Sequence, residues 1–156
     1  MEIREESFLK KINSANNICI DSSVLIYHLE DIKPYNKLTK ILISEIAKGQ
    51  ANCIISALTI TELLIKPYKL KDDEKIRLFE EFTKSLPNTI IQAIDYGIAK
   101  TAASIRAEYD LRTPDSLILA TALQSGSQLF ITNDIALKKI RSDTLKIIIF
   151  DYYLGS

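Results

Sequence analysis

Short apolar runs alternate with longer amphipathic stretches along the whole chain. The runs are rich in isoleucine and bounded by polar or turn-forming residues, which is the pattern of buried strands. Between them, apolar residues recur every three or four positions, which predicts helices. The pattern predicts strands at 17–20, 52–56, 89–93, 128–132 and 146–150, and helices at 22–29, 35–49, 57–66, 72–86, 96–109, 114–125 and 135–140.

This alternation predicts an α/β fold class. Strands that alternate with helices form a parallel sheet with helices packed on both faces. We therefore expect a three-layer α/β/α architecture around a central five-stranded parallel sheet. No linker, internal repeat or low-complexity tract interrupts the sequence, which predicts one domain over residues 1–156 with a core at about 18–150.

Three local signals refine the helices. Gly49 is a plausible C-cap for the helix at 35–49. Pro67 is expected to stop the helix that begins at Ala57. The segment 114–125 is apolar nearly all round, so we expect it to be buried.

Four acidic residues fall where this layout brings separate segments together. Asp21 directly follows the first strand, Glu62 lies early in the helix after the second, and Asp134 follows the fourth. Asp115 begins the helix that runs back antiparallel into the fourth strand, so it returns to the same carboxyl edge of the sheet. Ligands of parallel sheets bind outside this edge. The topology therefore predicts that the four acids converge.

Converging carboxylates require a compensating charge. At an effective dielectric constant of about 20, two carboxylates roughly 5 Å apart repel each other by about 3 kcal/mol. Protons or hard divalent cations relieve this repulsion. The chain has only one histidine, so a metal site here would rest on acids. A metal held by acids is typical of phosphodiester chemistry.

Each acid also has a structural alternative. Asp21 and Asp134 could be N-caps of the helices that follow them. The T-x-x-E motif ending at Glu62 matches a capping box. The T-P-D motif ending at Asp115 would make Thr113 an N-cap and Pro114 the first helical residue, with a dipole-stabilised acid in the first turn, worth roughly 0.3–1 kcal/mol. Capping does not require all four to share one edge, so jointly they favour a functional cluster. Two further acids follow strands and are interpreted as caps, Asp95 and Asp151.

Charge and hydropathy narrow the function classes. Twenty basic and 20 acidic residues give a formal net charge of zero. A protein that coats nucleic acid would be basic, whereas an enzyme that grips a few phosphates through metals and a local basic rim is compatible with this charge. No apolar run reaches the length of a membrane span, and the N-terminus lacks a signal-peptide core, so we expect a cytoplasmic protein.

The remaining reactive side chains support no competing enzyme class. Cys19 and Cys53 lie in apolar runs and are interpreted as core residues, although a disulfide stays open if their strands are neighbours. A Ser-His-Asp triad would depend on His28, and a two-histidine ribonuclease is impossible within one chain. No P-loop or G-x-G-x-x-G motif is present. The pattern after Asp21 also lacks the second Asp of a haloacid-dehalogenase-like phosphatase.

Four stretches resemble the PIN-domain family, and in length and layout the chain is similar to its VapC-type ribonuclease toxins. They are I-C-I-D-S-S-V-L-I (18–26), S-A-L-T-I-T-E-L-L (56–64), T-P-D-S-L-I-L-A-T-A-L (113–123) and L-F-I-T-N-D (129–134). The resemblance covers about residues 18–150. It implies an acidic pocket that binds Mg²⁺ or Mn²⁺, and cleavage of RNA that leaves 5′-phosphate and 3′-hydroxyl ends.

By position, the resemblance implies a role for each acid. Asp21 and Asp115 would hold the main metal directly. Asp134 would bind a second metal or a metal water, and Glu62 would complete the shell or orient the attacking water. Short polar side chains beside them would bind water or phosphate, or equally make ordinary turn hydrogen bonds: Ser22, Thr132 and Asn133. The candidate basic rim is Lys66, Lys69, Arg112, Lys138 and Lys139. Solvated surface charge explains these residues better, except for Arg112, which lies just before the helix of Asp115.

The chain departs from the family pattern in two places. The helix of Asp115 often carries a second acid in this family, but Ser116–Leu119 has none. Many members have a further acid beyond the position of Asp134, but Ile135–Lys139 has none. One-metal catalysis, or metal recruitment by RNA, therefore stays open.

The resemblance also implies partners. VapC-like proteins often form homodimers and are inhibited by a small antitoxin that docks a helix in a hydrophobic groove. The helices at 35–49 and 72–86 could build that groove, although core packing explains their apolar stripes equally well. The sequence hypothesis is a metal-dependent endoribonuclease of the VapC-like toxin type. The alternatives are a non-catalytic PIN-like binding or assembly module and a housekeeping PIN nuclease in RNA processing.

Overall fold

A computed structural model describes residues 2–154 of the chain. Its five strands are β1 (Asn17–Ile20), β2 (Asn52–Ser56), β3 (Thr89–Gln92), β4 (Leu129–Thr132) and β5 (Lys146–Ile149). Its α-helices are α1 (Glu2–Asn13), α2 (Ser22–Leu29), α3 (Asn36–Ala47), α4 (Ala57–Lys69), α5 (Asp73–Ser85), α6 (Tyr96–Tyr109) and α7 (Thr113–Gln124). Two 3₁₀ helices complete the described chain, η1 (Ile135–Lys139) and η2 (Phe150–Tyr153).

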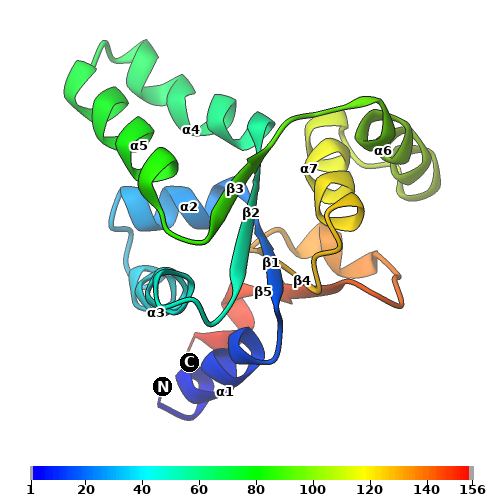
Figure 1. The fold of residues 1–156 in the computed structure, drawn as a ribbon, viewed down its shortest axis with the longest axis horizontal. Coiled ribbons are helices and arrows are strands. Elements are labelled where there is room, and N and C mark those ends of the chain that lie inside the picture. Colours follow the sequence, from blue (N-terminus) through cyan, green and yellow to red (C-terminus); the bar gives the residue numbers. More distant parts are fainter. Residues whose placement is uncertain (1, 155–156) are drawn as a thin grey trace.

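The five strands form one parallel sheet in the order β3-β2-β1-β4-β5, as expected (Figure 1). The chain first builds outward from β1 through β2 to β3, and then returns to add β4 on the other side of β1. The strand order thus reverses at β1. This reversal creates a crevice beyond the carboxyl ends of β1 and β4.

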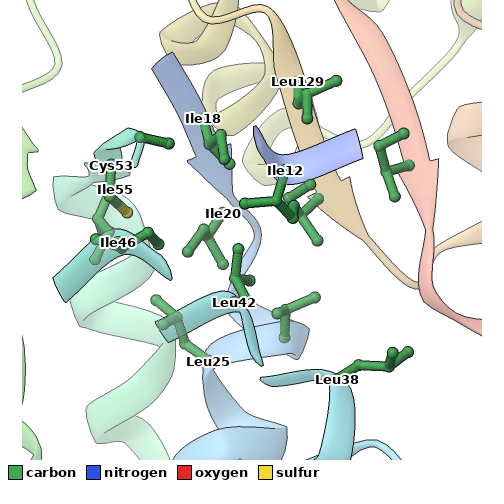
Figure 2. Close-up of a cluster of buried hydrophobic side chains, with 14 of the residues drawn as sticks. Ile12, Ile18, Ile20, Leu25, Leu38, Leu42, Ile46, Cys53, Ile55 and Leu129 are labelled. Atoms are coloured by element: carbon green, nitrogen blue, oxygen red, sulfur yellow. The ribbon is translucent and has the colours of Figure 1, made fainter. Parts of the chain in front are cut away.

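Helices cover both faces of the sheet, which confirms the three-layer architecture. On one face, α1, α2, α3 and α4 pack against the sheet through the cluster in Figure 2, where side chains such as Leu25, Leu42 and Ile46 surround Ile18 and Ile20. On the other face, α6 and α7 pack against Cys19 and Phe130. Alternate residues of each strand therefore serve opposite cores.

This alternation decides the state of the two cysteines. Cys19 pairs in register with Ile54, and Cys53 with Ile18, so the two thiols lie on adjacent strands but project to opposite faces. Both are buried and free, as core residues. The sequence left a disulfide between them possible if their strands were neighbours. The strands are neighbours, but the disulfide does not form.

Two features of the helices differ from the sequence expectation. Pro67 does not stop α4, which continues to Lys69, because a proline in the last turn removes only one backbone donor and its ring is buried. Helix α1 was not expected. It is fixed by Phe8, whose ring lies 5.5 Å from that of Phe150 and 5.4 Å from that of Tyr153.

Other local signals agree with the structure. Helix α3 ends at Ala47, and Gly49 follows it with φ of +85°, a left-handed conformation that a residue without Cβ adopts without strain. Helix α7 is buried on several sides, as its apolar composition predicts. Within residues 2–154, no helix has both the length and the apolar character needed to cross a membrane.

Candidate active site

A cleft of about 440 Å³ opens at the carboxyl ends of β1 and β4, where the strand order reverses. The four acids that the sequence placed at this edge all line it, although they come from four separate segments. Asp21 directly follows β1, and Asp134 follows β4 after one intervening residue. Glu62 and Asp115 lie in the first two turns of α4 and α7. The topology alone therefore accounts for their convergence.

Asp21 is held by hydrogen bonds to both of its carboxylate oxygens. Its Oδ1 accepts from the backbone N–H of Ser22 at 2.8 Å, and its Oδ2 accepts from the hydroxyl of Thr132 at 2.7 Å. Burial raises the pKa of Asp21 to about 6. The two hydrogen bonds oppose that rise, whereas the charges of Glu62 and Asp115 add to it. A bound cation would favour the ionised form of this carboxyl.

Glu62 is tied to the neighbouring helix rather than to its own. The hydroxyl of Ser22 donates to its Oε1 at 2.6 Å, which links α2 to α4. The capping-box alternative for Glu62 is wrong, because the N-cap of α4 is Ser56, whose Oγ accepts from the N–H of Leu58 at 3.2 Å. Glu62 therefore projects into the cleft without a capping role.

Asp115 forms an ion pair across the first turn of α7. The guanidinium of Arg112 donates to both carboxylate oxygens, from Nε to Oδ2 at 3.0 Å and from Nη2 to Oδ1 at 3.5 Å. The side chain of Arg112 is 77% exposed and that of Asp115 is 20% exposed. Arg112 occupies the N-cap position without a side-chain cap bond, so Thr113 is not the cap. An exposed arginine can leave this pair at little cost.

Asp134 does act as a cap. Its Oδ1 accepts from the N–H of Ala136 at 3.0 Å at the start of η1, and its own N–H donates to Oγ1 of Thr132 at 3.1 Å. The capping alternatives for Asp21 and Asp134 therefore describe real contacts. Within residues 2–154, Oδ2 of Asp134 receives no hydrogen bond, so one oxygen remains available to a ligand.

Asn133 lines the cleft but is engaged on its outer side. Its Nδ2 donates to the hydroxyl of Tyr27 at 3.1 Å and to Oδ1 of Asp151 at 3.3 Å, and its Oδ1 accepts from the N–H of Asp151 at 2.9 Å. Tyr35 also donates to Oδ1 of Asp151, at 2.9 Å. These bonds fasten the β4–η1 turn to η2, which is turn chemistry rather than ligand binding.

Several residues of the cleft were not singled out from the sequence. Helix α2 contributes Ser23, Ile26 and Tyr27, and α4 contributes Ile65. The available signal was helical spacing, since residues three or four positions apart share a helix face: Ile65 lies three positions after Glu62, and Ile26 and Tyr27 lie three and four positions after Ser23. Of the expected basic rim, Arg112 and Lys66 line the cleft, whereas Lys69, Lys138 and Lys139 do not.

His28 lies outside the cleft. Its Nδ1 is 3.2 Å from the hydroxyl of Thr39, its ring packs beside Phe82, and burial lowers its pKa. This environment gives the imidazole a packing role, so the triad alternative has no geometric support.

The donor set of the cleft fits a hard cation, but the ligands are not gathered into a finished site. Four carboxylates supply oxygen ligands of the kind that Mg²⁺ and Mn²⁺ prefer. The hydroxyl of Ser23, which also lines the cleft, is buried without a hydrogen-bond partner. Within residues 2–154, no three acid, histidine or cysteine side chains stand in a geometry that could hold a metal ion. Cation binding therefore requires small side-chain movements, including release of Asp115 by Arg112.

Comparison with solved structures shows the same fold in toxin–antitoxin complexes. VapBC2 from Rickettsia felis, bound to a promoter DNA fragment, has a chain that aligns with a TM-score of 0.64 and 18% identity, over 84% of this chain and 98% of that one. A toxin–antitoxin complex from Klebsiella pneumoniae aligns with a TM-score of 0.61 and 23% identity, over 83% and 95%. FitAcB from Neisseria gonorrhoeae aligns with a TM-score of 0.61 and 25% identity, over 76% and 88%.

Sequence comparison identifies the family. A search of curated proteins gave no significant match. The family model of the PIN domain, in contrast, matches residues 18–142, a span that includes all four acids of the cleft. The fold, its likeness to the VapBC structures and this match agree, and the chain therefore belongs to the PIN-domain family, a family of nucleases.

Proposed function

We propose that the protein is a metal-dependent endoribonuclease that hydrolyses RNA phosphodiester bonds and acts as a VapC-like toxin. One observation carries the proposal: four carboxylates from four segments line a single cleft at the β1–β4 crossover of a PIN-domain fold. Four acids that served only as caps would have no reason to share that cleft. Two of them, Glu62 and Asp115, receive no capping bond from their own helices.

The residues that would hold Mg²⁺ or Mn²⁺ are Asp21, Asp115 and Asp134, with Glu62 completing the set. When bound, such an ion lowers the pKa of a water molecule and neutralises charge on the phosphoryl oxygens. The raised pKa of Asp21 supports its place in this set, because a carboxyl enclosed beside other carboxyls gains most from a neighbouring cation.

The protein's own groups would orient the reactants. Ser22, by donating to Oε1 of Glu62, fixes that carboxylate and leaves its second oxygen to accept a proton from the attacking water. Thr132 holds the Asp21 carboxylate in one orientation. Arg112, once it has released Asp115, would bind a non-bridging phosphate oxygen with the same guanidinium fork.

Cleavage of a mixed RNA pool with Mg²⁺ or Mn²⁺ tests this function. The wild-type chain should cut, EDTA should abolish cutting, and Asp21→Asn should reduce it by at least about 10²-fold. The matched control is Asp95→Asn. Asp95 also follows a strand, but it caps α6 through the N–H of Ile98 and does not line the cleft. Because Asn caps helices as well as Asp, this variant should keep full activity.

A second candidate function, a non-catalytic binding or assembly module, is favoured by one observation. Each acid already has a protein partner, and no three of the described acids form a ready metal site. Metal-dependent stabilisation separates the two candidates. A functional site should raise the melting temperature with Mg²⁺ or Mn²⁺, and Asp21→Asn should remove the shift. No shift and no cleavage would favour the binding module.

A toxin would also need an inhibitor. For this inhibitor we propose a groove other than the one on the helices at 35–49 and 72–86 that the sequence suggested. It lies along α4, where Ile60, Leu64, Ile65 and Tyr68 line a hollow of about 470 Å³. Ile65 lines both this groove and the acidic cleft. A helix of an antitoxin docked there would place its flanking residues beside the acids. We propose this groove as the antitoxin site.

The toxin assignment and the homodimer have their own tests. Growth arrest on expression, relieved by Asp21→Asn, would distinguish a toxin from a housekeeping PIN nuclease with the same chemistry. Light scattering coupled to size-exclusion chromatography would establish whether the chain forms the homodimer proposed from its family resemblance.

A further inference from the structure

A second hollow, of about 460 Å³, lies at the amino ends of β4 and β5, which is the edge of the sheet opposite the acidic cleft. Cationic side chains from four elements of the chain surround it, and we call it the cationic pocket. They are Lys11 of α1, Lys138 of η1, Arg141 of the loop after η1, and Lys146 at the start of β5. A single carboxylate, that of Asp143, lines the pocket with them.

The four cations are not neutralised by the protein. Within residues 2–154, none of them comes within 4.0 Å of an acidic oxygen in an ion pair. Lys11 and Lys146 lie close enough to repel each other, and this repulsion lowers the pKa of Lys11. The whole chain has zero net charge, so the positive charge of the cationic pocket is a local feature. It is opposite in sign to the charge of the acidic cleft. An anion would relieve the repulsion.

The rest of the lining is suited to phosphate oxygens. Ser142 accepts hydrogen bonds from the backbone N–H groups of Thr144 and Leu145, and its hydroxyl lies 3.4 Å from that of Thr144, so one of these two hydroxyls keeps a proton to donate to a ligand. Ser14 and Thr144 add two more hydroxyls to the lining. Lys138 is held over the ring of Tyr152 at 4.9 Å, so its ammonium is already positioned.

Helix η1 connects the pocket with the acidic cleft. Its N-cap, Asp134, lines the cleft, and Lys138 near its other end lines the pocket. Four residues of a 3₁₀ helix advance by about 8 Å, at about 2.0 Å each. A short single strand of RNA covers this distance. The spacing suits one strand that reaches both sites.

We propose that the cationic pocket binds backbone phosphates of the RNA strand whose reacting phosphodiester lies in the acidic cleft. This inference rests on the proposed function. The pocket supplies the attraction for a polyanion that the acids of the cleft, by their charge, cannot supply. It therefore explains how a chain without net positive charge retains RNA. The contacts are to phosphates alone, so they give affinity and register but no base specificity.

The test compares two double variants in binding a fluorescent 12-nucleotide single-stranded RNA in EDTA, which prevents cutting. Lys11→Gln with Lys146→Gln removes two cations of the pocket. Lys37→Gln with Lys100→Gln removes two exposed lysines elsewhere and is the charge-matched control. The pocket variant should bind about tenfold more weakly. Its plot of log affinity against log salt should be shallower by about 1.4, since each lost contact to a single strand changes the slope by about 0.7.

Each other outcome overturns the inference. If the pocket variant bound RNA as tightly as the wild type, or if the control variant lost as much affinity as the pocket variant, the pocket would have no specific contact with RNA. If adenosine monophosphate raised the melting temperature of the wild-type chain but not of the pocket variant, and binding did not depend on RNA length, the pocket would hold a free nucleotide instead. The pocket variant should melt no lower than the wild type, because it loses only a repulsive pair.

The same measurements separate this inference from the proposed function. If the wild-type chain cuts no RNA but the pocket variant loses RNA binding and the control does not, the pocket stands and the nuclease proposal fails. If the wild-type chain cuts with Mg²⁺ and both variants bind RNA equally well, the nuclease stands and the pocket fails.

Discussion

The hydroxyl of Thr132 donates a 2.7 Å hydrogen bond to Oδ2 of Asp21, and so joins the ends of β4 and β1 at the acidic cleft. The hydroxyl oxygen of Thr132 in turn accepts from the N–H of Asp134 at 3.1 Å. One buried hydroxyl therefore sets both the orientation of one candidate ligand and the turn that carries another. This makes Thr132 the structural centre of the candidate site.

Replacing Thr132 with Val should damage the site without changing side-chain volume. The variant leaves Oδ2 of Asp21 and the N–H of Asp134 without a partner, so the free energy of unfolding should fall by about 1–3 kcal/mol. The pKa of Asp21 should rise further, because the lost hydrogen bond lowers it in the native protein. Urea unfolding measures the first effect, and the pH dependence of the unfolding free energy measures the second. Thr132→Ser should restore both, and a fully stable Thr132→Val would contradict this role.

Asp21 should make the metal-free protein less stable as pH rises. Burial raises its pKa in the folded state to about 6, above the unfolded value near 3.8. Between these values the folded state binds more protons than the unfolded state, so stability falls as pH increases through this window. The cost at neutral pH is on the order of 3 kcal/mol.

The comparison with Asp21→Asn isolates this effect. In EDTA, the free energy of unfolding of the wild type minus that of the variant should decrease from pH 4 to pH 7. A difference that did not change with pH would contradict the raised pKa. Saturating Mg²⁺ should reverse the trend above pH 6, because the cation binds only the ionised carboxylate.

Replacing Arg112 with Gln should change metal binding and activity in opposite directions. Loss of the guanidinium frees the carboxylate of Asp115, so Mg²⁺ affinity should rise about twofold to fivefold. The kcat/KM for RNA should nevertheless fall by about tenfold or more, because a charged phosphate donor is lost. Calorimetry and cleavage kinetics measure the two quantities. A parallel fall in both would show that Arg112 helps to hold the cation site together.

The groove on α4 should control inhibition without affecting catalysis. Tyr68 is 60% exposed and Ile65 is 48% exposed, so Tyr68→Glu should leave folding and cleavage intact. This variant should weaken inhibition by the antitoxin at least about tenfold, because docking would bury the new glutamate charge against an apolar helix face, which costs free energy. The control is Tyr96→Glu on α6, which is 85% exposed and lies outside the groove. Equal inhibition of Tyr68→Glu and the wild type would contradict this docking site.

The sequence predicted most of the fold because its signals were local. Isoleucine-rich runs located all five strands within one residue at each end, and Gly49 marked the end of α3. Helix α1 was not predicted, although Phe8 and Ile12 have the four-residue spacing of one buried helix face. Its stability depends on Phe150, which is far away in the sequence. Pro67 was overestimated as a helix breaker, because its burial offsets the one backbone hydrogen bond that proline removes near the end of α4.

Prediction of the cleft succeeded for residues that follow strands and failed for contacts between helices. The carboxyl edge of a parallel sheet fixes where Asp21 and Asp134 emerge, whatever their side chains do. No local pattern indicated that Ser22 binds Glu62, that Arg112 pairs with Asp115, or that Glu62 lacks a capping role. These contacts depend on how α2, α4 and α7 pack against one another.

The sequence by itself determined the order of strands and helices, the burial of both cysteines and the edge of the sheet at which four acids meet. Periodicity and the handedness of parallel connections are local rules, and they suffice for these features. Only the tertiary structure decided which carboxylates cap a helix, which one accepts from a neighbouring helix and which one is paired with an arginine. It alone gathered Lys11, Lys138 and Lys146 around one pocket. Distances of a few ångströms between distant segments arise from packing, and no local pattern encodes them.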